Sequence, residues 1–255
     1  MSTLDAVRDY RPHRLLALWH STIGKKYVAA VSGLILAIFV VLHMLGNLKA
    51  LEGAGGGHPA VDRYAHFLRT VGSPVLPHDF ALWTERGVLI LALVLHVTAI
   101  TQLWLRNRAA KPSGHHIRRV RSTIAARTVR YSGVLILAFV VFHILQFTTF
   151  TIHPTAMVRG TVYANTYGAF HAWWLVVIYV GAVTVLGLHI LHGLWSGTQT
   201  AGIDNPDRNW FWRRLAAAVA VVTVIGFAAV PILFAANVLP RPVTEAAHVD
   251  PAARR

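Results

Sequence analysis

Residues Tyr27–Leu48 read YVAAVSGLILAIFVVLHMLGNL, and this stretch decides the fold class. It contains no Asp, Glu, Lys or Arg; Lys25 and Lys26 stand before it, and Lys49 follows. About 20 apolar residues in a helix are needed to cross a hydrocarbon core of about 30 Å. The stretch therefore predicts a transmembrane helix.

Four further apolar runs of similar character follow along the chain. They are approximately Ala81–Leu105, Val134–Phe150, Phe170–Trp195 and Leu215–Leu239. An open chain can satisfy its backbone groups in lipid only as a helix. The composition agrees, because 55% of the residues are hydrophobic and 13% are charged, against about 25% charged in soluble proteins. We expect an all-α integral membrane protein with five transmembrane helices in a bundle.

The charge distribution predicts the topology. We divide the chain into an N-terminal segment (1–26), a transmembrane domain (27–239) and a C-terminal tail (240–255), and we expect residues 243–255 of the tail to be disordered. Five crossings place the termini on opposite sides. The N-terminal segment and the connections 106–130 and 197–214 share one side and hold 16 of the 24 Lys and Arg residues. The positive-inside rule places the N-terminus in the cytoplasm and the C-terminus outside.

Two further features exclude classes of function. The net charge of +14 does not indicate nucleic-acid binding, because the basic residues flank apolar spans. The chain has no cysteine, which excludes disulfides, an iron–sulfur cluster on its own thiolates and haem attached through Cys-x-x-Cys-His. Any redox cofactor must be held by nitrogen or oxygen ligands, or by a partner chain.

One histidine lies inside each of the first four spans: His43, His96, His143 and His189. An ionisable side chain in a span is costly and usually marks function. A histidine bonded to a neighbouring helix is the ordinary alternative for any single one. One in each of four successive spans instead favours two b-type haems, each with two axial histidines. Such six-coordinate iron transfers electrons and has no open position for a substrate.

The depth of the four histidines predicts how they pair. Counted from the cytoplasmic ends of their spans, His43 and His143 lie 17 and 13 residues deep, whereas His96 and His189 lie 10 and 11 residues deep. At about 1.5 Å per residue, we expect His43 to pair with His143 nearer the outside. His96 would pair with His189 nearer the cytoplasm.

Other residues near these spans have less specific interpretations. His192 competes with His189 as a ligand, and we expect it to make a polar contact or to neighbour a haem propionate. Small residues on the ligand-bearing helices would leave room for a macrocycle or mark helix–helix contacts: Gly46, Gly133, Gly187 and Gly193. The remaining histidines that we considered lie at span ends or in loops, where a solvated ring is usual: His115, His116, His153 and His171.

Several stretches point to one family. STIGKK at 21–26 leads into a span that ends HMLGN at 43–47; RTVRYSG at 127–133 runs on to Phe142 and His143; HILHGLWS occupies 189–196. In this order and spacing they resemble the single-chain, two-haem cytochrome b anchor of succinate dehydrogenases and fumarate reductases. The resemblance covers most of residues 20–235.

The resemblance implies that His43 and His143 bind the distal haem b, and His96 and His189 the proximal haem b. It also implies a flavoprotein subunit with FAD and an iron–sulfur subunit on the cytoplasmic side, a quinone, expected to be menaquinone, and a bacterial cytoplasmic membrane. Certain fumarate reductases of this type carry a glutamate two residues before the fourth ligand, in a proton path. Gly187 stands there in this chain, which argues against that path.

The quinone site is less clear from the sequence. His20 and Ser21, just before the first span, are candidates for a quinone site near the iron–sulfur subunit. The alternative is that they are ordinary polar residues at the membrane interface. Possible proton carriers for an outer site are His78, Asp79 and Glu85.

Two other classes of protein stay open at this point. One is the cytochrome b anchor of another quinone-linked dehydrogenase, of the hydrogenase or formate dehydrogenase type. The other is a haem-free transporter whose histidines line a polar path, although we find no broken helix or internal repeat. A bc-type cytochrome b fits less well, because it places two histidines on each of two helices.

Overall fold

The computed structural model describes residues 19–53, 58–110, 124–153 and 155–242. All the regular secondary structure of these residues is helical. The chain order is α2 (Thr22–Leu48), η1 (Lys49–Glu52), α3 (Ala60–Thr70), α4 (Phe80–Ala109), α5 (Ile124–Phe147), α6 (Val162–Phe170), α7 (Trp173–Thr200) and α8 (Asn209–Ala235). The prediction of five transmembrane helices is confirmed: α2, α4, α5, α7 and α8 are long and apolar enough to span a membrane. Most of the C-terminal tail (243–255), His115 and His116 lie outside the described residues.

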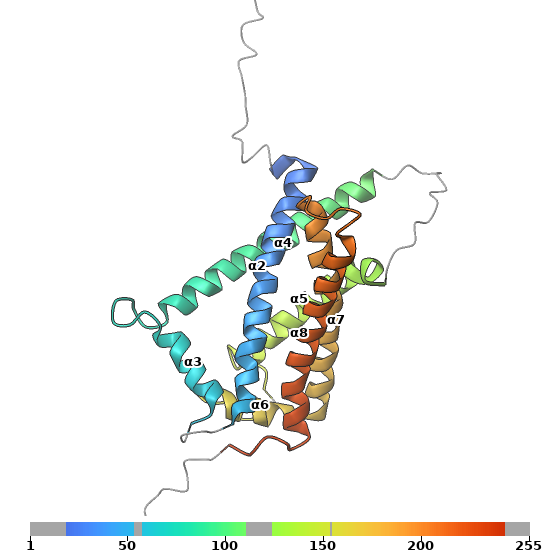
Figure 1. Cartoon of the computed structure of the whole chain (residues 1–255). Helices are drawn as coiled ribbons and strands as arrows, with labels where there is room; N and C mark the ends of the chain where they lie inside the picture. Colours follow the sequence, from blue (N-terminus) through green and yellow to red (C-terminus); the bar gives the residue numbers. More distant parts are fainter. Residues whose placement is uncertain (1–18, 54–57, 111–123, 154, 243–255) are drawn as a thin grey trace, which may run out of the picture.

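The five spanning helices form a bundle in which α2, α7 and α8 pack together, while α4 packs on α2 and α5 on α7. Small residues permit the closest approaches. Gly187 of α7 faces Val224 of α8, and Gly226 of α8 faces Met44 of α2. Helix α2 begins and helix α8 ends at opposite ends of the bundle (Figure 1), as an odd number of crossings requires.

At three ends the helix stops short of the expected apolar run. The third span ends at Phe147, not at Phe150, and the fifth ends at Ala235, not at Leu239. The fourth begins at Trp173, because Phe170 closes the short helix α6 and the chain turns between the two helices. Apolar residues such as Phe150, Ala172 and Leu239 lie within or beyond these breaks, so average hydropathy alone does not reveal them.

The two connections at the end where α2 finishes contain helices that the sequence reading missed. The apolar runs leave residues 53–79 and 151–169 as connections, but α3 lies within the first, and α6 begins within the second and ends at Phe170. The two helices are joined because the Tyr163 amide donates a hydrogen bond to Asp62 Oδ1 at 2.9 Å. The Tyr163 hydroxyl donates to the Pro240 carbonyl at 2.8 Å. Together they cover this end of the bundle (Figure 1).

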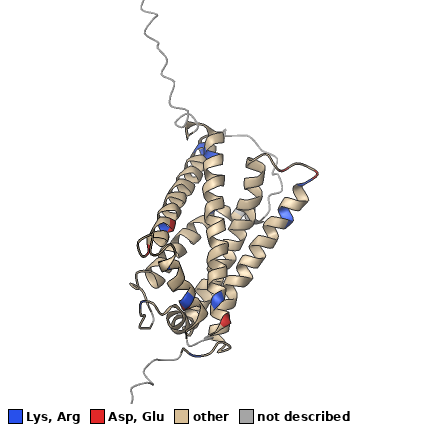
Figure 2. Cartoon of the chain, turned by 60° about the vertical axis from the view of Figure 1, so that its left-hand side comes forward, with Lys and Arg blue, Asp and Glu red and all other residues tan. Residues whose placement is uncertain are grey.

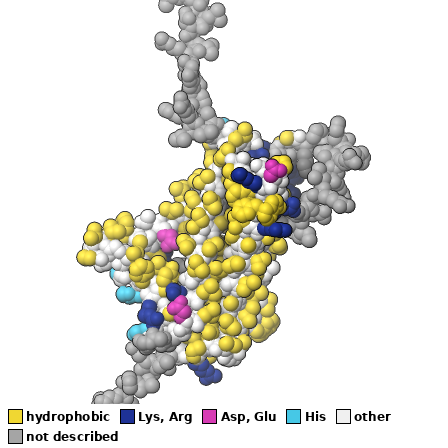
Figure 3. All heavy atoms as spheres, viewed as in Figure 1, with side chains coloured by type: hydrophobic (Ala, Val, Ile, Leu, Met, Phe, Trp, Pro, Cys, Tyr) yellow, Lys and Arg dark blue, Asp and Glu magenta, His cyan; other side chains and the backbone are white. Residues whose placement is uncertain are grey.

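The surface agrees with a membrane setting. Charged residues lie mostly near the helix ends and in the connections (Figure 2). Hydrophobic side chains dominate the middle of the visible face (Figure 3). Large apolar side chains such as Ile90, Val134 and Ile225 are 64%, 70% and 64% exposed, which suits contact with lipid but not with water. The orientation of the termini stays a prediction.

Candidate cofactor-binding site

The four span histidines form two pairs. The ring centroids of His43 on α2 and His143 on α5 lie 5.9 Å apart, with an interplanar angle of 78°. Those of His96 on α4 and His189 on α7 lie 6.4 Å apart, at 68°. These are the two pairings that the depth argument predicts. We call them the distal pair (His43 and His143) and the proximal pair (His96 and His189).

The spacing within each pair suits two axial ligands on one metal centre. A metal–imidazole nitrogen bond is about 2 Å long and the centroid lies about 1 Å behind the nitrogen, so two axial rings have centroids about 6 Å apart. No group of three or more His, Cys, Asp or Glu residues able to hold a metal ion occurs in the part of the chain that the structure describes. A haem needs only two such side chains, because it brings its own in-plane nitrogens.

The helices that carry each pair are not close-packed neighbours. Helices α2 and α5 make few close backbone approaches, and so do α4 and α7; α2 instead packs against α4 and α8, and α5 against α7. The imidazole rings of each pair nevertheless lie close together. This arrangement is compatible with a flat macrocycle between the rings, so the donor set and its spacing fit b-type haem.

The two pairs lie at different levels of the bundle. On α2, Gly33 lies against the His96 ring, and His43 follows ten residues later. On α5, Ser132 contacts His189, and His143 follows eleven residues later. At about 1.5 Å per residue, the levels are about 15 Å apart along the helices.

Each ring of the proximal pair has a hydrogen-bond partner on another helix. His96 Nδ1 lies 2.9 Å from the Ala29 carbonyl oxygen of α2. His189 Nδ1 lies 3.0 Å from Ser132 Oγ of α5. A Cβ atom on Gly33 would lie 2.9 Å from His96 Cε1, so only glycine at position 33 admits this ring position without a shift.

The distal pair combines one hydrogen-bonded ring with stacking contacts. His143 Nδ1 lies 3.1 Å from the Tyr179 hydroxyl of α7, which donates to Gln146 Oε1 at 2.9 Å. Gln146 is fully buried. Phe39 stacks on His43, with centroids 5.3 Å apart. The distal rings are therefore held by an aromatic and amide environment from three helices.

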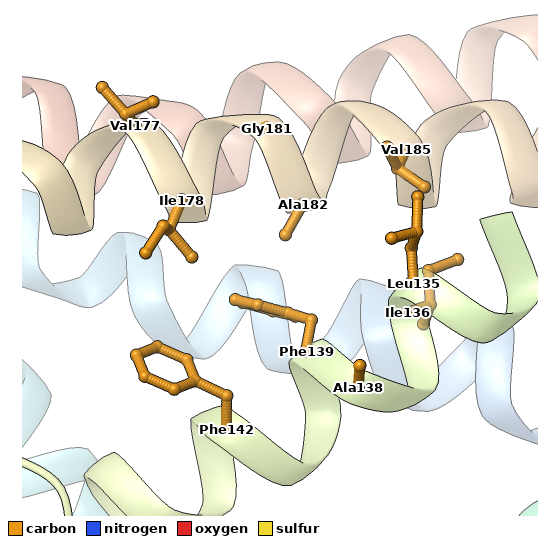
Figure 4. Close-up of a pocket in the computed structure, with 10 residues that line it drawn as sticks. All are labelled: Leu135, Ile136, Ala138, Phe139, Phe142, Val177, Ile178, Gly181, Ala182 and Val185. Atoms are coloured by element: carbon orange, nitrogen blue, oxygen red, sulfur yellow. The ribbon is translucent and has the colours of Figure 1, made fainter. Parts of the chain in front are cut away.

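An apolar pocket of about 440 Å³ lies beside the distal pair, between α5 and α7. Phe139 and Phe142 project from α5 toward Ile178 and Ala182 of α7 (Figure 4). Phe139 also stacks on His143, with centroids 6.0 Å apart. Every residue that lines this pocket is apolar or glycine, so it offers no side-chain hydrogen bond to a ligand.

His192 and the four glycines that the sequence analysis named lie in different surroundings. His192 Nδ1 is buried and has no hydrogen-bond partner among the described residues, and the structure leaves its predicted polar role open. Among the glycines on the ligand-bearing helices, Gly133 faces His189, with a would-be Cβ 3.6 Å from Cε1. Gly46 and Gly187 face Tyr64 and Val224, and Gly193 faces open space.

His20 and Ser21, the candidate quinone residues, each take part in a hydrogen bond within the protein. Ser21 Oγ caps α2 by accepting from the Gly24 amide at 2.8 Å. The His20 carbonyl accepts from Arg106 Nη1 at 3.0 Å.

At the other end, Asp79 lies 3.3 Å from the guanidinium of Arg69 and 3.1 Å from the His78 ring. Glu85 is exposed one turn into α4. These contacts leave a quinone site at either end untested.

The sequence did not predict the residues that surround the rings, namely the side chains of Ser132, Tyr179 and Gln146 and the glycine at position 33. A signal for two of them exists. Ser132 precedes His143 on α5 by eleven residues, and Tyr179 precedes His189 on α7 by ten. This is about three helical turns, so a polar residue and a histidine occupy the two levels on one helix.

Comparison of the chain with family models, with curated proteins and with solved structures found no match to any of the three.

Proposed function

We propose that this chain is the membrane-anchor cytochrome b subunit of a succinate:quinone oxidoreductase. In this role it carries electrons from an iron–sulfur subunit through two b haems to a quinone, expected to be menaquinone. The observation that supports the proposal most is the arrangement of four span histidines as two pairs, at two levels, with the spacing of axial ligands.

The chain's own residues have defined tasks in this proposal. The distal pair holds one haem and the proximal pair holds the other. When bound, each haem would supply reversible one-electron chemistry. Phe39 and Phe139, stacked on the distal rings, keep water from that level. Hydrogen bonds to the Ala29 carbonyl, the Ser132 hydroxyl and the Tyr179 hydroxyl orient three of the four rings.

The separation of the two histidine pairs along the bundle distinguishes the two ends of the proposed electron pathway. Two levels about 15 Å apart along the helices divide the bundle into an end near the proximal pair and an end near the distal pair. The proximal end is the one at which α2 begins, and the segments that the topology prediction assigns to that side hold 16 of the 24 Lys and Arg residues. We place the docking surface for the iron–sulfur and flavoprotein subunits there, on the cytoplasmic side of a bacterial membrane.

Optical spectroscopy of the purified chain tests the cofactor. A reduced-minus-oxidised spectrum should show a b-type α-band, with two haems per chain. His43→Ala and His189→Ala should each remove one haem, while His153→Ala, a substitution in a loop, should retain both. A colourless wild-type chain would exclude the electron-carrier function and favour the transporter class.

Co-purification tests the complex. From native membranes, the chain should bring with it a flavoprotein and an iron–sulfur protein with succinate:quinone activity. Hydrogenase or formate dehydrogenase subunits in their place would assign the chain to the other class of quinone-linked anchors. The succinate assignment relies on the motifs at 21–26, 127–133 and 189–196, and this experiment examines it apart from haem binding.

A further inference from the structure

We propose that Ser132 and Tyr179 are positioning residues, which hold the Nδ1–H tautomers of His189 and His143 and thereby lower the reduction potential of each haem. The inference rests on the proposed function, since it concerns the haems that the two pairs would hold. Each of the two residues contacts the histidine that lies on the other residue's helix. Ser132 on α5 contacts the ring carried by α7, and Tyr179 on α7 contacts the ring carried by α5.

The hydrogen-bond directions follow from counting protons. Ser132 has one hydroxyl proton, and its Oγ lies 2.8 Å from the Val129 carbonyl oxygen. A carbonyl oxygen can only accept, so the hydroxyl proton is directed there. The contact of 3.0 Å between Ser132 Oγ and His189 Nδ1 must then be donated by the ring. His189 therefore carries its proton on Nδ1 and keeps a lone pair on Nε2.

The same count applies at the other level. The Tyr179 hydroxyl donates to Gln146 Oε1 at 2.9 Å, which uses its only proton. The contact of 3.1 Å with His143 Nδ1 is then donated by the ring. Gln146 is fully buried, so water does not compete for the Tyr179 proton. His143 also keeps its Nε2 lone pair.

The other two rings differ from each other. His96 Nδ1 faces the Ala29 carbonyl at 2.9 Å, a backbone acceptor that no side-chain substitution removes. For His43 the structure gives ring contacts with Phe39 and Phe227 in place of such a bond. Each pair thus contains one ring with a side-chain hydroxyl as an acceptor. His189 is also hydrogen-bonded to the Val129 backbone, but each of the two hydroxyls can be removed singly.

The chemical consequence concerns the basicity of the ligands. An imidazole that donates from Nδ1 to an acceptor is a more basic ligand at Nε2. A more basic ligand favours ferric over ferrous iron, because the ferric ion carries the larger positive charge. Removing the acceptor should therefore raise the reduction potential of that haem and leave the other unchanged.

Redox titration of the α-band in the purified full-length chain tests this inference. Tyr179→Phe keeps the aromatic ring and removes only the hydroxyl, and Ser132→Ala removes only Oγ. We expect Tyr179→Phe to raise the potential of the distal haem alone and Ser132→Ala that of the proximal haem alone. We expect a change of about tenfold in the ferrous-to-ferric ratio of the affected haem, which corresponds to about 59 mV for one electron.

Two further variants serve as controls. Ser132→Thr restores a hydroxyl and should restore the wild-type potential. Thr184→Val on α7 removes a hydroxyl that bonds only within its own helix, to Val180 at 2.8 Å, and should shift neither haem. If the Ser132→Ala variant loses the proximal haem, the Ser132→Thr variant must retain both haems at wild-type potentials for the inference to stand.

Unchanged potentials in both Tyr179→Phe and Ser132→Ala, or equal shifts of both haems in either variant, would overturn the inference and leave the proposed function intact. A wild-type chain without b haem would overturn both.

Discussion

Gly33 of α2 lies against the imidazole ring of His96 on α4, so that a Cβ atom on Gly33 would come within 2.9 Å of His96 Cε1. This contact fixes how closely α2 and α4 approach at the level of the proximal pair. The same ring bonds to the Ala29 carbonyl one turn earlier on α2. The position of one predicted ligand thus depends on the absence of a side chain on the neighbouring helix.

Gly33→Ala should displace the His96 ring, because the added methyl group lies inside the contact distance. We expect selective loss of the proximal haem and retention of the distal one. The measurement is the haem-to-protein ratio of the purified variant. Gly181→Ala is the matched control, since a Cβ atom there meets nothing within 4 Å. Two retained haems in Gly33→Ala would show that the ring can move without losing its ligand function.

Gly187→Ala should destabilise the bundle. A Cβ atom there would clash with Val224 of α8 and lie 3.6 Å from the Ala220 carbonyl, and valine has little freedom to move away. Overpacking of this kind costs about 1–3 kcal/mol. Thermal unfolding in detergent, followed by circular dichroism, should give a lower Tm than for Gly181→Ala on the same helix. An equal Tm for the two variants would contradict the close α7–α8 contact.

Asp62→Ala should loosen the end of the bundle that α3 and α6 cover. Asp62 Oδ1 accepts from the Tyr163 amide at 2.9 Å, at the first turn of α6, where amides lack partners within the helix. Loss of a capping side chain costs about 1 kcal/mol. Asp62→Asn keeps an acceptor oxygen and should lose less. Hydrogen exchange of the Tyr163 amide should rise in the alanine variant; an unchanged rate would refute the capping role.

Tyr163 should make stability sensitive to alkaline pH. Burial, with a smaller effect of the neighbouring Tyr167, raises the pKa of the Tyr163 phenol. In the unfolded chain a tyrosine ionises at about pH 10, before the folded one does, so ionisation favours unfolding above that pH. Below pH 10 this group adds no pH dependence, and stability should fall as the pH rises further.

The Tyr163→Phe variant isolates this effect. It loses the hydrogen bond to Pro240 and should have a lower Tm at neutral pH, yet a smaller further fall in Tm between pH 9 and pH 11. Tyr131→Phe, at a residue that is 73% exposed, should follow the wild-type curve. If Tyr163→Phe and the wild-type chain lose Tm in parallel above pH 10, this tyrosine does not account for the alkaline sensitivity.

Much of the architecture is determined by the sequence alone. A span must be about 20 apolar residues long and helical in lipid, so composition predicts the five helices directly. The depth of His43, His96, His143 and His189 follows from the constant rise of a helix. For this reason the pairing of the rings was also predictable before any contact was known.

Only the tertiary structure decided what surrounds those rings. The acceptors Ser132 and Tyr179, the fully buried Gln146 and the Gly33 contact depend on which helix faces which, and hydropathy carries no information on rotation about a helix axis when every side is apolar. The break before Trp173 and the helices α3 and α6 were missed for a related reason. The way α3 and α6 meet involves long-range bonds, such as that of Asp62 with Tyr163, between residues that only folding brings together.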